Sequence, residues 1–342
     1  MKNEQEIKLN NVIHLKDVFV GNHGIIFDSY GKIMGANELS DFDNLNNNFG
    51  ANNHLKPFLC FKDNPKILNL EMDEKNVIDS IINKTYIKAD DVPYIHTFHF
   101  FNIYVWGHLW DSLNNLEDFE GSNIDFRLAV SQITSHVRDL LLHFDILGYN
   151  QSKITSFPWT GHPYKFPNLY VSNIWSEACY IRNKAWIEKK YINENSHLNE
   201  SLDELRSKKY KLYLSRSEYG KNRKTLNEDL VWKILEGKGY IKLNGEEGLI
   251  KHIKYFMGAE KIIYTHGSMI KNTAFCLNRD VEIWEFYPLG RMNNKHFPKY
   301  GCDNVFQRLN KNMGLNKHFF LPIESDKDQN VILDLELIDR IS

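Results

Sequence analysis

Residues 210–286 alternate short apolar runs with segments of helical spacing, and this pattern restricts the possible folds more than any other feature. Strands that alternate with helices of about ten residues form βαβ units around a parallel sheet. We therefore predict an α/β fold. The expected strands are residues 211–215, 240–243, 261–265 and 281–286. The expected helices begin at residues 227, 246 and 268, the first with Asn227 as its N-cap. The first ends at Gly237 or Gly239, the second at residue 257 and the third at residue 277.

A polar, charged stretch at residues 192–209 precedes this pattern and marks a change in composition. Before it, aromatic-rich segments mix with proline-containing loops. A chain of 342 residues suits two domains of ordinary size. We expect an N-terminal domain over residues 1–205, a second domain over residues 206–325 and a C-terminal tail over residues 326–342.

The residues that follow each expected strand form the first candidate site, because parallel sheets bind ligands beyond the carboxyl ends of their strands. Ser215 and Arg216 follow the first strand, and Arg223 lies in the loop after them. A guanidinium group forms strong, charge-assisted hydrogen bonds with phosphate oxygens. The two arginines are therefore candidate ligands of a phosphate group.

A second group of candidates, His266, Gly267 and Ser268, follows the third expected strand. Gly267 lets the backbone approach a ligand closely, and Ser268 opens a helix whose first N–H groups and dipole favour an anion. This arrangement suits a diphosphate. At the exit of the fourth strand, the Glu285 carboxylate can hold a ribose through two hydrogen bonds. A strand-face carboxylate paired with a nearby cation is the alternative.

The motifs of this half occur in a definite order, in the segments Leu212-Tyr-Leu-Ser-Arg-Ser, Arg223-Lys-Thr-Leu-Asn-Glu, Thr265-His-Gly-Ser-Met-Ile-Lys-Asn-Thr-Ala-Phe275 and Glu282-Ile-Trp-Glu-Phe-Tyr-Pro288. This order resembles glycosyltransferase family 61. That family has Ser-Arg after a strand, then Arg-x-x-x-Asn-Glu at a helix entry. A His-Gly-small-x-x-x-Asn loop and helix and a Glu-x-x-Pro strand exit follow. The spacing of the motifs also agrees with the family.

The resemblance implies an inverting glycosyltransferase of the GT-B fold, in which two Rossmann-like domains face each other across a cleft. A UDP-sugar is the expected donor, without a divalent metal or another cofactor. The expected acceptor is a glycan or glycolipid in the synthesis of bacterial surface polysaccharide, capsule or lipooligosaccharide. Asn272 has an alternative role, which is to tie its helix to a neighbouring loop. The residues implied to line the nucleotide-sugar pocket are Ser215, Arg216, Arg223, His266, Gly267, Ser268, Asn272 and Glu285.

The catalytic base is expected in residues 104–116, which resemble the family's N-terminal motif of an aromatic-His pair followed by an acid. In a helix, His108 and Asp111 would lie at positions i and i+3 and share a face. We take Asp111 as the expected base and His108 as a substrate contact or alternative base. The family places its histidine four residues before the acid, where this chain has Gly107. A non-catalytic nucleotide- or glycan-binding subunit therefore stays open as an alternative.

Other patterns argue against metal and dinucleotide sites. His96, His99 and His108 have no carboxylate between them, so they are not expected to bind a metal. The Asp-x-Asp pattern at residues 326–328 lies in a charged stretch and is expected to be a solvated loop. No Gly-x-Gly-x-x-Gly follows an expected strand, which argues against a dinucleotide-binding dehydrogenase. The aromatic segment 157–170 suits a sugar-stacking surface or, alternatively, the core.

Charge and cysteine content limit the partners and the compartment. A net charge of −2 offers no basic excess for nucleic-acid binding, which depends on phosphate neutralisation. The N-terminus lacks the apolar region of a signal peptide, and no stretch reaches the ~20 apolar residues of a membrane span. We expect a cytoplasmic protein, with peripheral association with the inner membrane left open. The cysteines, expected to be reduced thiols, are Cys60, Cys179, Cys276 and Cys302.

Overall fold

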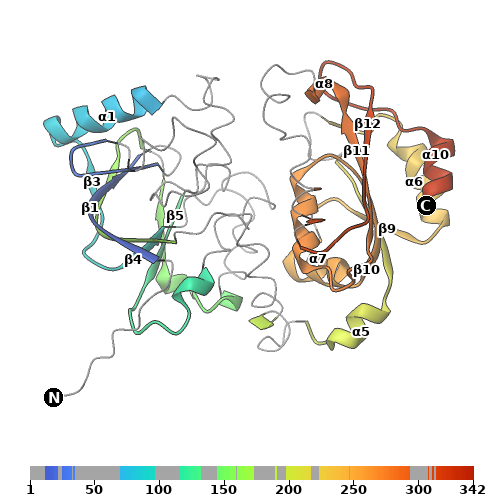
Figure 1. Cartoon of the computed structure of the whole chain (residues 1–342), viewed down its shortest axis with the longest axis horizontal. Coiled ribbons are helices and arrows are strands. Elements are labelled where there is room, and N and C mark those ends of the chain that lie inside the picture. The colour runs from blue at the N-terminus through green and yellow to red at the C-terminus, as the bar shows by residue number, and fades with distance from the viewer. Residues whose placement is uncertain are drawn as a thin grey trace. The chain divides into compact units, whose positions relative to one another are not determined.

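The chain divides into two compact units, Met1–Cys179 and Tyr180–Ser342, which are described separately (Figure 1). Both contain a sheet with parallel strands, so the fold is α/β as predicted. No helix within the described residues is long and apolar enough to cross a membrane. The computed structural model describes residues 12–21, 25–32, 34, 70–96, 116–131, 145–158, 160–172, 189–190, 198–216, 223–245, 247–292, 307, 310–311 and 313–342.

Unit 1 contains a mixed sheet with the strand order β2-β1-β7-β4-β5-β6, and β3 also pairs with β7. β1 runs antiparallel to β2 and β7, whereas the other pairs are parallel. The strands are β1 (Val12–Val20), β2 (Ile26–Phe27), β3 (Ile87–Lys88), β4 (Tyr94–His96), β5 (Arg127–Ser131), β6 (Ile154–Phe157) and β7 (Tyr164–Ser172). The helices described in this unit are α1 (Leu70–Asn83), η4 (Leu116–Phe119) and η5 (Gln151–Lys153).

Aromatic side chains form part of the core of unit 1. Phe157, Tyr164 and Phe166 are buried. Tyr94 of β4 meets both Phe157 and Phe166 edge-on, with ring centroids 5.4 Å apart in each pair. This geometry is the one that aromatic quadrupoles favour, and it adds to the stabilisation from burial. These three residues of the aromatic segment 157–170 therefore belong to the core.

Unit 2 contains a parallel sheet with the strand order β12-β11-β10-β8-β9. The four predicted strands are confirmed as β8, β9, β10 and β11. β12 was not predicted from the sequence, and it lies at the edge of the sheet, where the missing N–H of Pro322 is tolerated. The strands are β8 (Tyr210–Leu214), β9 (Tyr240–Leu243), β10 (Ala259–Thr265), β11 (Glu282–Pro288) and β12 (His318–Ile323).

The helices of unit 2 agree only in part with the predicted ones. α6 has the expected extent, and α7 begins three residues later than predicted, after Gly248. The third predicted helix winds as a 3₁₀ helix, η7, over the whole span Ser268–Phe275. The helices are α5 (Leu202–Ser207), α6 (Glu228–Gly237), α7 (Leu249–Met257), η7 (Ser268–Phe275), α8 (Leu289–Met292) and α10 (Leu335–Ile341).

The packing of η7 explains its tighter winding. Every residue from Ile270 to Leu277 is buried, so the segment lacks the single apolar stripe typical of a surface α-helix. The backbone N–H of Cys276 donates to the carbonyl of Thr273 at 3.0 Å, three residues back along the chain. A 3₁₀ helix has this repeat of three residues per turn. The prediction of an α-helix here is wrong because tertiary packing outweighs local propensity.

Asn227 occupies the predicted N-cap position of α6, but its side chain makes no capping hydrogen bond. Its amide nitrogen donates to the carbonyl of Leu333 at 2.8 Å, and its oxygen accepts from the Leu333 N–H at 3.0 Å. The prediction that this side chain caps the first turn of α6 is therefore wrong, because its partner is Leu333. The side chain instead ties the start of α6 to the C-terminal segment of the chain.

Both ends of unit 2 differ from the boundaries expected from the sequence. Leu205 of α5 is fully buried, and Glu200 pairs with Lys254 of α7 at 2.7 Å, which holds residues before 206 in this unit. Residues 326–342 are not a separate tail. Ile338 of α10 packs in the same core as Val231 of α6, and the two helices lie side by side (Figure 1).

We expect Ile338→Ala to destabilise unit 2 by about 2–4 kcal/mol, because it removes a fully buried side chain and leaves a cavity between α10 and α6. Urea unfolding of the full-length protein measures this change. Ile332→Ala is the matched control, because Ile332 is 68% exposed and its truncation should cost at most about 0.5 kcal/mol. Equal stability of the two variants would contradict the role of α10 in the core.

Candidate active site

The strand order of unit 2 determines where a ligand can bind. β8 lies between β9 and β10, so the chain first extends the sheet on one side of β8 and then on the other. At such a switch point the loops after the two central strands diverge and leave a crevice beyond their carboxyl ends. Arg216 follows β8 and His266 follows β10. The two groups of sequence-predicted residues therefore meet at the switch point of the sheet.

Arg216 and Gly267 approach each other closely at this point. A Cβ atom added to Gly267 would lie 2.1 Å from Nη1 of Arg216 and 3.3 Å from its Cζ, so only glycine leaves room for the guanidinium group. The backbone of Gly267 is extended, with φ of −175°, so the requirement for glycine arises from space and not from an unusual dihedral angle. The contact places a positive charge against the backbone at the start of η7.

Arg223 brings a second guanidinium group to the same turn. Its Nη1 donates to the carbonyl oxygen of His266 at 3.5 Å. Its backbone has φ of 61° and donates from its N–H to the carbonyl of Asp328 at 3.1 Å. The hydroxyl groups of Thr225 and Thr265 are 2.9 Å apart and tie the loop to the end of β10. The C-terminal segment therefore supports the conformation in which Arg223 reaches His266.

The Asp-x-Asp pattern at residues 326–328 forms an exposed turn, as expected. The Asp326 carboxylate accepts from the backbone N–H groups of Asp328 and Asn330, both at 2.8 Å, and from the Asn330 amide at 2.9 Å. The side-chain hydrogen bond from Asn330 is the main cause that lowers the pKa of Asp326. The turn in this way holds the Asp328 carbonyl that accepts from Arg223.

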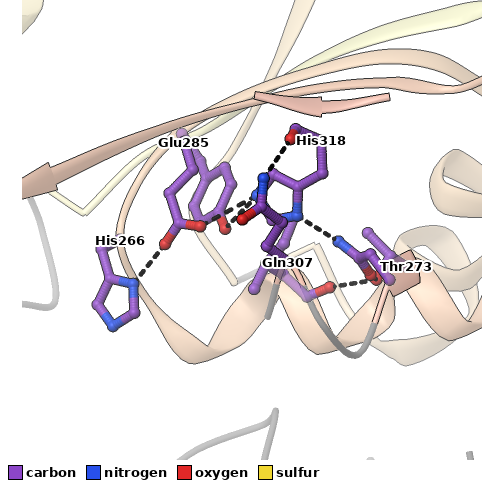
Figure 2. Close-up of polar contacts among 8 residues, drawn as sticks. His266, Thr273, Glu285, Gln307 and His318 are labelled. Atoms are coloured by element: carbon purple, nitrogen blue, oxygen red, sulfur yellow. Dashed lines mark hydrogen bonds and ion pairs between the residues drawn. The ribbon is translucent and has the colours of Figure 1, made fainter. Parts of the chain in front are cut away.

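Glu285 lies between two histidines in the interior of unit 2 (Figure 2). Its Oε1 is 2.5 Å from Nδ1 of His266, and its Oε2 is 3.0 Å from Nε2 of His318. The three residues are 1%, 4% and 5% exposed, for Glu285, His266 and His318 respectively. The carboxylate is therefore paired with neighbouring side chains, which agrees with the alternative interpretation of its position on the strand.

The two imidazole groups keep Glu285 ionised in spite of its burial. Burial alone would raise the pKa of this carboxyl group, because the charged form loses its hydration. Hydrogen bonds from His266 and His318 have the opposite effect and prevail, so the pKa falls from 4.5 to about 2. A buried carboxylate at this position thus carries a negative charge at neutral pH.

The network continues beyond His318 to residues that sequence analysis missed. Nδ2 of Asn310 is 3.0 Å from Nδ1 of His318, and the Thr273 hydroxyl lies 2.6 Å from Oδ1 of Asn310. The amide of Gln307 donates to the carbonyl of His318 at 2.8 Å (Figure 2). No local motif marks Gln307 and Asn310, because they precede the unpredicted strand β12 and their contacts are with its first residue, His318, and with Thr273 of η7.

The other residues that the sequence predicts for the site lie in different places, and some of them lie outside the described residues. Asn272 is buried, and its Nδ2 lies 3.2 Å from Nδ1 of His252, so it ties η7 to α7. The backbone N–H of Ser215 donates to the carbonyl of Leu243 at 2.8 Å, next to the site. Ser268 begins η7, and its side chain lies outside the described residues, as do His108 and Asp111.

The metal-site candidates can be followed only in part. His96 is buried in β4, whereas His99 lies outside the described residues. In the part of the chain that the structure describes, no group of three or more His, Cys, Asp or Glu side chains is arranged to hold a metal ion.

Comparison with known protein families gives a match that covers more than half of the chain. The family described as Glycosyltransferase 61 matches residues 80–281. This range spans parts of both units and includes Arg216, Arg223 and His266, but it ends before Glu285 and His318. No curated protein sequence matches the chain.

We expect the acid stability of unit 2 to depend on Glu285. The pKa of this group is lower in the native protein than the ordinary 4.5 of the unfolded chain. Its stabilisation is therefore complete above pH 4.5 and is lost as the pH falls towards 2, because the unfolded chain takes up the proton first. The loss should be on the order of 3 kcal/mol.

Urea unfolding of the wild type and of Glu285→Gln between pH 7 and pH 3 measures this effect. The variant should show a flatter decline of the free energy of unfolding below pH 4.5 than the wild type. Glu336→Gln serves as the control, because this side chain is exposed on α10 and should leave the decline unchanged. An identical acid dependence in all three proteins would contradict the assignment.

Proposed function

Because the chain belongs to glycosyltransferase family 61, we propose that it transfers a sugar from a nucleotide-sugar donor, expected to be a UDP-sugar, to a glycan or glycolipid acceptor. The observation that carries this proposal is the cluster at the switch point of unit 2. There Arg216 lies against Gly267, and Arg223 lies against the carbonyl of His266. Two guanidinium groups beside the start of a helix suit a nucleotide diphosphate.

The proposed reaction places negative charge on this cluster. The acceptor hydroxyl gives its proton to a general base, and its oxygen attacks the anomeric carbon of the donor. The bond from that carbon to the diphosphate breaks, and the leaving diphosphate keeps the electron pair. Arg216 and Arg223 would stabilise this charge, as fixed cations do in other transfer reactions. We therefore propose that transfer does not need a divalent metal or another cofactor.

The base and the domain arrangement are proposed from the family resemblance. We assign the base to Asp111, with His108 as a substrate contact or alternative base, and attack opposite the leaving group would invert the anomeric centre. In the GT-B arrangement, the N-terminal unit would present this base and the acceptor across a cleft from the donor. The proposed setting is the synthesis of capsule, lipooligosaccharide or another bacterial surface polysaccharide, in the cytoplasm or at the inner membrane.

We expect UDP to raise the melting temperature of the wild type by several degrees in the presence of a metal chelator. Binding at 100 times the Kd adds about 2.7 kcal/mol to the stability of the native state. Arg216→Ala and Arg223→Ala should each weaken UDP binding roughly tenfold to hundredfold, which is the effect of losing a hydrogen bond between charged groups. A thermal-shift titration and calorimetry measure both quantities.

Two pairs of variants make this test specific. Arg340→Ala removes an exposed arginine from α10 and should leave UDP binding unchanged. Gly267→Ala should act like Arg216→Ala, because the added methyl group would occupy the position of the guanidinium group. Gly237→Ala is its control, because a Cβ there meets no atom within 4 Å. Stabilisation by NAD(P) in place of UDP, or by UDP only with a metal ion, would contradict the proposal.

We expect Asp111→Ala to lower the rate of sugar transfer roughly 10²–10⁴-fold, the usual contribution of a general base. UDP binding should stay unchanged, because the proposed nucleotide site lies in the other unit. Transfer and donor hydrolysis are measured with a panel of UDP-sugars and glycan acceptors. A wild type that binds UDP but shows neither reaction would support a non-catalytic nucleotide- or glycan-binding subunit instead.

A further inference from the structure

The buried charge of Glu285 must be balanced by a group in contact with it. Its carboxylate is 1% exposed and stays ionised at neutral pH. An ionised group in a protein interior is tolerated only when it is paired and hydrogen-bonded. Among the residues that the structure describes, the side chains that contact its two oxygens as ion-pair partners are His266 and His318. At least one of these imidazole rings is therefore expected to carry the compensating positive charge.

Asn310 determines which of the two rings carries that charge. The Oδ1 atom of Asn310 lies 2.6 Å from the Thr273 hydroxyl, which can donate to it, and this directs the amide nitrogen towards Nδ1 of His318. An amide nitrogen only donates, so Nδ1 of His318 must accept and has no proton. The single proton of that ring is then on Nε2, where it donates to Glu285. His318 is accordingly held as a neutral hydrogen-bond donor.

With His318 held as a neutral donor, the other contact of the carboxylate has to balance its charge. Nδ1 of His266 lies 2.5 Å from Oε1 of Glu285. The ion pair is therefore between Glu285 and His266. With Nδ1 bound to Glu285, the other nitrogen of the His266 ring, Nε2, is directed away from the carboxylate (Figure 2).

We propose that Asn310 and His318 are positioning residues which, through Glu285, hold His266 as an imidazolium whose Nε2–H donates to the diphosphate of the donor. This inference rests on the proposed function and adds a third cation to the two arginines. It also gives Glu285 a role through His266 instead of through direct contact with a ribose. Asn310 and His318 lie beyond the range of the family match, which ends at residue 281.

Other ionisable groups also face His266. The guanidinium groups of Arg216 and Arg223 lie against Gly267 and the His266 carbonyl, and both oppose a third positive charge. A bound diphosphate neutralises this repulsion and favours the imidazolium. We call the contacts that run from Asn310 through His318 and Glu285 to His266 the relay. The relay therefore predicts that nucleotide binding and protonation of His266 strengthen each other.

Two tyrosines complete the surroundings of the relay. Burial, assisted by the charge of Glu285, raises the pKa of Tyr264 well above its ordinary value, so this residue stays neutral. Tyr287 packs its ring against the imidazole of His266 with centroids 4.5 Å apart. Neither group supplies a positive charge to Glu285, so the balance depends on the two histidines.

The experiment is a pH titration of the full-length protein with ¹³Cε1-labelled histidine, followed by ¹H–¹³C NMR. His266→Gln identifies the signal of His266. In the wild type, this signal should be that of an imidazolium at about pH 7. In Asn310→Asp, the new carboxylate accepts from Nδ1–H of His318 and favours the charged form of that ring. The positive charge should then move to His318, and the His266 signal should become that of a neutral ring.

UDP binding provides the second measurement. Asn310→Asp should raise the Kd for UDP roughly tenfold, because His266 no longer donates as a cation. Asn278→Asp is the matched control: the substitution adds the same charge at a half-buried turn, and the new carboxylate can still accept from the N–H of Asp280. It should change neither the His266 signal nor the Kd.

Each outcome decides the proposal. A neutral His266 in the wild type at pH 7, both free and with UDP, would overturn it regardless of the variants. An unchanged His266 signal in folded Asn310→Asp would also overturn it. If that variant does not fold, Glu285→Gln replaces it, and His266 should become neutral there as well. Absence of UDP binding by the wild type would contradict the proposed function, while the NMR titration would still judge the relay.

Discussion

The parallel pairing of β8 with β10 is the constraint on which the candidate site depends. The register aligns Leu214 with Tyr264, so the chain leaves both strands at nearly the same level of the sheet. Arg216 and Gly267 follow within three residues of that level, and the guanidinium group can then lie against the glycine backbone. A shift of register along either strand would separate the two groups. The contact between Arg216 and Gly267 thus depends on the pairing of the two strands as well as on the identity of the residues.

How much of this arrangement can be predicted from the sequence depends on the range of the interactions. Four strands of unit 2 were predicted because their apolar runs are local signals, and the rule for parallel sheets then located His266 and Arg216 at the correct edge. β12 was missed because Pro322 and a polar flank weaken its pattern. His318 and Asn310 were missed with it, because their contacts with Glu285 and with each other arise only after the chain has folded.

The capping prediction at Asn227 failed for a related reason. An asparagine before two acidic residues is the usual signal of a helix cap, and the helix does begin there. The amide instead pairs with Leu333, more than 100 residues away, and so connects α6 to the C-terminal segment. That segment also supplies the Asp328 carbonyl to Arg223. Residues that look like a tail in the sequence therefore support the proposed nucleotide site.

The cost of burying Glu285 is an argument that the relay has a role beyond stability. A buried ion pair recovers little more than the hydration that its charges lose, and an apolar pair of similar volume often serves the fold as well. The chain nevertheless places Asn310 in contact with His318, and His318 in contact with the Glu285 carboxylate. The other contact of that carboxylate is the ring of His266, which follows β10 at the switch point. If this series of contacts only stabilised unit 2, it would not need to end at a residue beside Arg216 and Arg223. Its position supports the proposal that a charge on His266 serves the ligand.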